Sequence, residues 1–205
     1  MASPLKGAEV DWSHITADGV THLCSIPTLE YLDISWVGLP AGALLSIKKA
    51  SSLHCLKLNA HNIDHKLVSA LNHLPIEVLH LNQCQIEGLS SLSIPTLREI
   101  WLWDSNIRDD DLSFVQSSPL LERIELKGTH IEGVKFHPLR KLSNLRILNI
   151  SQTKLHANAL GCVHDLPSLV YLDLSHTPVS KWHIDLLKEN RRNNKLPIIQ
   201  IRESS

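Results

Sequence analysis

Cysteine and histidine are the residues of this 205-residue chain that could most readily do chemistry. His54 and Cys55 are sequence neighbours, and His61 and His65 have the i, i+4 spacing that a helix presents as a pair of metal ligands. Neighbours on a strand point to opposite faces, however, and no third Cys, His or carboxylate completes a site with His61 and His65. The sequence therefore predicts neither a thiol-histidine pair nor a metal centre.

Other catalytic patterns are missing as well. The chain has no Gly-rich phosphate loop, no nucleophile elbow and no Cys-x-x-Cys motif. The acidic run of Asp109, Asp110 and Asp111 falls at a predicted helix start, where carboxylates interact favourably with the helix dipole. We expect no catalytic residues, no cofactor and no enzyme activity.

Aromatic residues offer the second kind of chemistry, which is recognition. Trp12 and Trp36 are 24 residues apart, and Trp101 and Trp103 are two residues apart. Aromatic side chains with polar neighbours are typical of the energetically dominant residues of protein interfaces. Such a role requires that the rings face solvent, which depends on the elements that carry them.

An internal repeat predicts the secondary-structure elements that carry these aromatic residues. The motif L-x-x-L-x-L-x-x-x-x-L, with Leu, Ile or Val at most apolar sites, recurs every 21 to 24 residues. The eight copies start at Leu5, Leu29, Leu53, Ile76, Leu97, Leu121, Leu145 and Leu169, and a partial closing copy starts at Leu196.

Each copy predicts a strand followed by a short outer segment. The L-x-L alternation has a period of two, which sends the apolar side chains of a strand to one face. After the fourth apolar site, seven copies have further apolar residues five and eight positions on, and this three-residue offset favours a helical turn. The copy that contains Ile86 is three residues shorter there, so we expect 3₁₀ or extended backbone. Stacked copies bury one continuous core.

From Leu5 to Arg202 this pattern resembles the leucine-rich repeat family. The resemblance implies an α/β fold in which one domain, residues 1–205, forms a right-handed solenoid. A parallel β-sheet would line its concave face, and short helices or 3₁₀ turns its convex face. The family usually has Asn three residues after the third apolar site, where this chain has Ser13, Val37, His61, Cys84, Ser105, Thr129, Thr153 and Thr177. This column is similar to that of the Thr- and Cys-containing intracellular or bacterial subclasses.

The residues between the apolar strand sites are predicted to face the concave side. Trp12 and Trp36 would lie about 4.8 Å apart on adjacent strands and could stack, and Trp101 and Trp103 would form a second cluster three to four coils away. An alternative is that these rings only pack on one another and stabilise the sheet. The candidate protein-binding residues are Trp12, Tyr31, Asp33, Trp36, Lys57, His80, Trp101, Trp103 and Glu125.

Three functions are compatible with this pattern. The first is a non-catalytic interaction module that binds a protein or peptide on its concave face. The second is the substrate-recognition part of a larger enzyme or adaptor, such as a ubiquitin-ligase component or an effector. The third is a structural protein that self-associates through the edge at Ala8–Val10, since no polar cap precedes the first copy.

Composition narrows the classes further. The chain has 20 basic and 21 acidic side chains, which argues against a nucleic-acid binder. No apolar stretch is long enough for a membrane span or a secretory signal, so we expect a cytoplasmic protein. Its four cysteines, on different coils, are expected to be free thiols. The cationic side chains of Lys188, Arg191, Arg192 and Lys195 are expected to solvate the terminal helix and loop.

Overall fold

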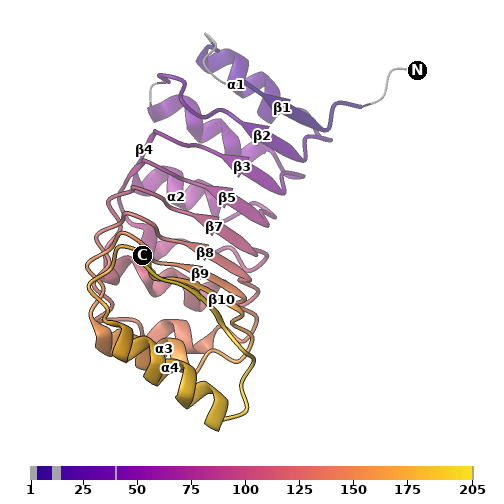
Figure 1. The fold of residues 1–205 in the computed structure, drawn as a ribbon. Helices are drawn as coiled ribbons and strands as arrows, with labels where there is room; N and C mark the ends of the chain where they lie inside the picture. Colours follow the sequence, from indigo (N-terminus) through magenta and orange to yellow (C-terminus); the bar gives the residue numbers. More distant parts are fainter. Residues whose placement is uncertain (1–3, 11–14, 40, 205) are drawn as a thin grey trace.

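The computed structural model describes residues 4–10, 15–39 and 41–204 as a stack of similar coils. Parallel strands follow one another along one side of the stack, and helical segments cover the opposite side (Figure 1). Because helices pack about 8–10 Å apart and paired strands about 4.8 Å apart, the stack curves with the sheet on its inner side. The predicted α/β leucine-rich-repeat solenoid is confirmed.

Nine short strands of the described chain form one parallel sheet, in the order β1-β2-β3-β5-β7-β8-β9-β10-β11. The strands are β1 (Gly7–Glu9), β2 (Tyr31–Asp33), β3 (Cys55–Lys57), β5 (Val78–His80), β7 (Glu99–Trp101), β8 (Arg123–Glu125), β9 (Ile147–Asn149), β10 (Tyr171–Asp173) and β11 (Gln200–Arg202). In each of the first eight, the strand starts two residues after the first apolar site of its copy. In the closing copy the strand starts four residues after Leu196.

The central residue of each strand from β2 to β10 is fully buried, as the two-residue period predicts. These residues are Leu32, Leu56, Leu79, Ile100, Ile124, Leu148 and Leu172. Their neighbours on each strand point the other way and form the surface that we call the sheet face. The core is thinner at the first copy, where Leu5 is 47% exposed because no coil covers it in the described structure.

The outer segments are a mixture of α and 3₁₀ helices. The α-helices are α1 (Ala17–Cys24), α2 (His65–Leu71), α3 (Leu160–His164) and α4 (Lys181–Asn193). The 3₁₀ segments are η1 (Ala41–Lys49), η2 (Leu89–Ser91), η3 (Asp109–Ser117), η4 (His137–Lys141) and η5 (Ala157–Ala159). The predicted irregular copy contains η2 and is confirmed. A second, two-stranded sheet joins β4 (Asn62–Ile63) to β6 (Gln85–Ile86).

Side chains also tie several coils to the coil before them. In these coils the residue just before the first apolar site donates a hydrogen bond to a backbone carbonyl about one coil earlier. Examples are Thr28 to Leu5 at 2.7 Å, Ser52 to Pro27 at 2.7 Å and Ser168 to Ser143 at 2.6 Å. These bonds satisfy carbonyl groups that the short strands leave unpaired, and they help to hold the strands in register.

Candidate functional site

Five of the candidate residues lie in one row across the sheet face. Strand register places Asp33 beside Lys57, then His80, Trp101 and Glu125 in turn. The row continues through Asn149, Asp173 and Arg202, and we call these eight residues the inner row. Of the two tryptophan clusters expected from the sequence, this row contains Trp101, whereas Trp36 of the other cluster is not part of it.

An aromatic cluster occupies the middle of the inner row. The ring of His80 stacks on Trp101 with centroids 4.9 Å apart and planes 8° apart. Trp103 meets Trp101 edge to face at 5.1 Å. The guanidinium carbon of Arg123 lies 4.2 Å from the centroid of the Trp101 ring, in cation–π contact. We call His80, Trp101, Trp103 and Arg123 the aromatic cluster, and each member is half-buried.

The buried carboxylate of Glu125 holds this cluster in place. Glu125 is 2% exposed, and its Oε1 accepts a 2.8 Å hydrogen bond from Nε of Arg123. Its Oε2 accepts a 3.0 Å hydrogen bond from the indole N–H of Trp103. Because its negative charge is paired with Arg123 and shielded from water, Glu125 positions its neighbours rather than presenting a free charge.

A smaller polar group lies at the other end of the inner row. Lys57 Nζ is 3.5 Å from Asp33 Oδ2 and 5.3 Å from the centre of the Tyr31 ring. Asp33 is buried, and its Oδ1 accepts a 3.0 Å hydrogen bond from the backbone N–H of Ser35. The pKa of Lys57 is raised, mainly by its hydrogen bond with Tyr31. Lys57 therefore keeps its charge, which lies beside Asp33 and Tyr31.

Trp36 lies beyond the end of its strand, in a turn. Its φ is 62°, and it is 41% exposed. The equivalent position of other coils is also left-handed, at Ala60, Gln83, Asp104, Gly128, Gln152 and His176. The chain thus turns at this column, which the alternation of the strand does not reveal. Trp12 lies outside the described residues, so its predicted stacking on Trp36 stays a prediction.

A hollow of about 310 Å³ adjoins the aromatic cluster on the sheet face. It is lined by Trp103, Arg123, Glu125, Ile147, Asn149, Tyr171, Asp173 and Arg202. Arg123, Tyr171 and Arg202 were not among the sequence candidates. Arg123 and Tyr171 occupy the same sheet-face column as the candidate Tyr31, so the repeat itself carried the signal that could have found them.

Burial favours the neutral forms of two ionisable side chains on the sheet face, His80 and Cys55. It is the main reason why the pKa of His80 is lowered to about 4, and the nearby positive charges of Lys57 and Arg123 lower it further. His80 is therefore a neutral ring at neutral pH. Burial also raises the pKa of the Cys55 thiol, which is the opposite of what a reactive thiolate needs.

His61 and His65, the histidine pair noted in the sequence, are not part of a metal-binding arrangement in the described structure. His61 is buried just before β4, while His65 begins α2 and packs against Gly88. Over the described residues, no group of three or more His, Cys, Asp or Glu side chains is arranged to hold a metal ion. All four cysteines are free. No helix of the described chain is long and apolar enough to cross a membrane.

A family model described as leucine rich repeat matches residues 119–179, in the C-terminal half of this regular array. The resemblance to the leucine-rich repeat family that the sequence shows is thus supported. The leucine-rich repeat-containing G-protein coupled receptor 5 of Rattus norvegicus is 26% identical over 163 residues. That match covers 77% of this chain, which spans only 17% of the length of the receptor.

Solved structures of two internalins from Listeria monocytogenes share the fold of this leucine-rich repeat protein. One internalin has a TM-score of 0.69 at 16% identity, and the match covers 90% of this chain and 52% of the internalin. Internalin C2 has a TM-score of 0.68 at 17% identity, with 95% and 78% covered. At these identities the similarity concerns the fold alone.

At the site where leucine-rich repeat proteins usually have Asn, this chain uses other side chains in two ways. In the first coils the side chain reaches one coil back: His61 Nε2 is 2.8 Å from the carbonyl of Ile34, and the Cys84 thiol donates to Leu58 at 3.1 Å. Ser105 donates to Leu81 at 2.7 Å in the same manner. In later coils the hydroxyls of Thr129, Thr153 and Thr177 donate within their own coil. The side chain of Val37 has no hydrogen-bond donor. His61, from the next coil, contacts the carbonyl of Ile34 in the coil that contains Val37.

Proposed function

We propose that this leucine-rich repeat protein is a non-catalytic module that binds a protein or peptide on its sheet face. The observation that supports this proposal most directly is the aromatic cluster. Trp101 and Trp103 are half-buried on a surface, although the chain has a complete aliphatic core in which large side chains are buried. Amphipathic rings held rigidly beside paired charges are the usual composition of an interface centre.

The geometry of the cluster favours recognition over simple packing. Trp101 is held by contacts from two neighbouring strands, through His80 and Arg123, so little side-chain entropy remains to be lost on binding. The adjoining hollow of about 310 Å³ provides a recess beside these rings. Leucine-rich repeat domains generally bind protein ligands, and solenoids do so through an extended inner surface.

The test is affinity capture from native lysate with the wild type beside Trp101→Ala. We expect the substitution to weaken capture about 30-fold or more, the effect of losing about 2 kcal/mol at an interface centre. Its melting temperature should change little, because the side chain lies outside the core. Trp36→Ala combined with Trp101→Ala should abolish capture.

Trp182 provides the matched control, because this tryptophan is 67% exposed on α4, on the helical side of the stack and not on the sheet face. Trp182→Ala removes an exposed indole but should leave capture unchanged. The proposal would be wrong if Trp182→Ala weakened capture as much as Trp101→Ala did, or if Trp101→Ala kept every partner.

A further inference from the structure

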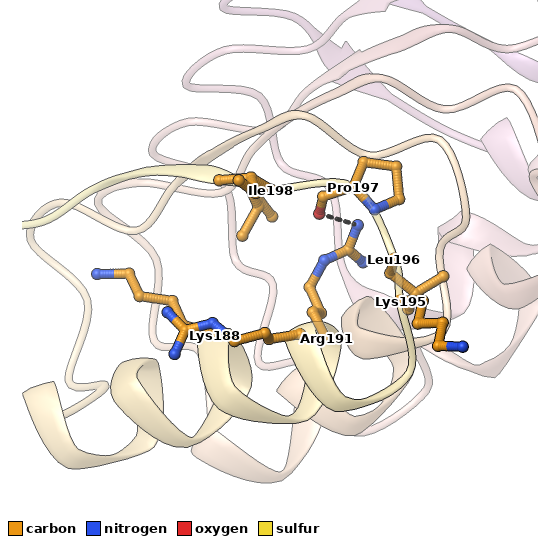
Figure 2. A pocket seen from close by; sticks show the side chains of 8 residues that line it. Lys188, Arg191, Lys195, Leu196, Pro197 and Ile198 are labelled. Atoms are coloured by element: carbon orange, nitrogen blue, oxygen red, sulfur yellow. Dashed lines mark hydrogen bonds between the residues drawn. The ribbon is translucent and has the colours of Figure 1, made fainter.

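The last coil contains a cavity that is separate from the sheet face. It lies between α4 and the segment 195–199, has a volume of about 300 Å³ and is open to solvent (Figure 2). Four cationic residues line it, namely Lys188, Arg191, Arg192 and Lys195, and the apolar residues 196–199 form another wall. The cavity therefore combines positive charge with aliphatic surface.

Arg191 is the unusual residue of this cavity. The sequence interpretation that it solvates the terminal helix is wrong, because its side chain is only 1% exposed. Its Nη1 donates to the carbonyls of His164 at 3.0 Å and Leu166 at 2.9 Å, near the end of α3. Its Nη2 donates to Leu169 at 3.0 Å, and to Pro197 at 3.4 Å as Figure 2 shows. The guanidinium thus joins α4 to the preceding coil.

Two interactions that usually stabilise a buried guanidinium are missing at Arg191 in the part of the chain that the structure describes: a hydrogen bond from Nε and an ion pair with a carboxylate. Its Nε is buried and has no hydrogen-bond partner among the described residues. No carboxylate in that part of the chain pairs with the guanidinium, so its positive charge is offset by carbonyl dipoles alone. Burial lowers the pKa of Arg191 without any opposing acidic group. A buried cation in this condition is stabilised by any anion that comes close to it.

The entrance adds further positive charge. Lys188 forms an ion pair with Glu203 at 3.0 Å, but Arg192 and Lys195 are exposed and make no ion pair within the described chain. Ile198 beside them is 95% exposed, and in Figure 2 its side chain lies over the cavity. An exposed aliphatic side chain next to unpaired cations matches a ligand that has an anionic end and an aliphatic body.

We propose that this cavity binds a carboxylate carried on an aliphatic group, with the carboxylate next to Arg191 and the aliphatic group against Ile198. Both terminal nitrogens of the guanidinium are already engaged by carbonyls, which leaves one donor rather than the two-pronged fork that favours phosphate. Residues 196–199 add mainly apolar surface, which suits a single negative charge better than a double one.

This chemistry has two sources: a free short-chain fatty acid, or the C-terminus of a peptide whose last residue is aliphatic. The experiment is an NMR titration of the intact chain with hexanoate, N-acetyl-leucine, N-acetyl-leucinamide and inorganic phosphate. N-acetyl-leucinamide is the matched neutral control. We expect the carboxylates to shift the backbone signals of Leu196 and Ile198–Ile199 and the Nε–H signal of Arg191.

Which carboxylate binds more tightly identifies the source, since N-acetyl-leucine represents a peptide terminus and hexanoate a free acid. Either order supports the site. Equal binding of N-acetyl-leucinamide, tighter binding of phosphate, or no shift with either carboxylate would overturn the proposal. These outcomes leave the sheet-face function untouched, because the cavity shares no residue with the inner row.

Two exposed residues of the cavity allow a test that does not disturb the fold. Arg192→Gln and Lys195→Gln should each weaken carboxylate binding up to about fivefold, the effect of losing an exposed charge pair. Ile198→Ser should weaken binding of both carboxylates as well. Lys181→Gln, on the exposed first turn of the same helix, is the control and should bind as the wild type does.

Discussion

The imidazole of His80 lies parallel to the indole of Trp101, with ring centroids 4.9 Å apart and planes 8° apart. The two residues are direct partners in the register of β5 and β7. Arg123, on β8, contacts the same indole at 4.2 Å. One tryptophan therefore links side chains from three adjacent strands, and this arrangement has a consequence for pH dependence.

His80 should titrate with a pKa of about 4, mainly because burial disfavours its charged form. Since an unfolded histidine has a pKa of about 6.5, the unfolded chain binds more protons between these two values. The contribution of His80 to stability is thus complete above about pH 6.5 and is lost as the pH falls toward 4. An NMR titration of the His80 ring measures the pKa directly.

Trp101→Ala is the matched variant for this titration. Without the indole the imidazole becomes more accessible to water, and its pKa should rise toward the unfolded value. A wild-type pKa already near 6.5, or one that Trp101→Ala does not change, would contradict the stacked arrangement.

Of the three consecutive carboxylates at residues 109–111, that of Asp109 should contribute most to the free energy of unfolding. Its buried carboxylate accepts hydrogen bonds from the backbone N–H groups of the next coil, at Gly133 (3.0 Å), Val134 (2.8 Å) and two neighbouring residues. Asp109→Ala leaves these donors without an acceptor, and we expect a loss of about 3 kcal/mol in the free energy of unfolding. Urea denaturation followed by circular dichroism measures the loss.

Asp110 is the control, because its carboxylate is exposed and pairs only with Lys135. Asp110→Ala should cost less than about 1 kcal/mol. Equal losses for the two variants would mean that the bonds made by Asp109 contribute no more than a surface ion pair.

His61 should tolerate replacement by Asn better than replacement by Ala. Its Nε2 lies 2.8 Å from the carbonyl of Ile34, in a coil where Val37 offers no donor. His61→Ala leaves that buried carbonyl unpaired and should cost about 1–3 kcal/mol in thermal or urea unfolding. His61→Asn restores a donor and should cost less. His54 is exposed, so His54→Ala is the control and should change the free energy of unfolding by no more than about 0.5 kcal/mol. If His61→Ala cost no more than His54→Ala, the contact of His61 with the Ile34 carbonyl would not stabilise the fold.

Gly128 should not accept a side chain without a loss of stability. Its φ is 70°, and a Cβ at this position would lie 2.1 Å from Oδ1 of Asp104. We expect Gly128→Ala to cost about 1–2 kcal/mol, from left-handed backbone strain and from displacement of the Asp104 carboxylate. In an Asp104→Ala background only the backbone part, about 1 kcal/mol, should remain. An unchanged cost would show that the carboxylate moves freely.

The strands and the core follow from the sequence because their cause is local. Alternation within L-x-L decides which side chains face inward, and the regular spacing of copies places equivalent residues on adjacent strands. This reasoning placed Lys57, His80 and Trp101 on one surface. It did not show that Trp36 leaves the strand, because left-handed backbone at that column has no consistent residue type.

Amino-acid sequence by itself determined the repeat, the buried leucine columns and the surface that carries the tryptophans. Tertiary structure alone decided what happens between coils: which carbonyl His61 serves, which amide groups surround Asp109, and that Arg191 is buried while Arg192 is exposed. The physical reason is that these contacts join residues more than 20 positions apart, so they depend on how each coil is seated on the next and not on any pattern within one coil.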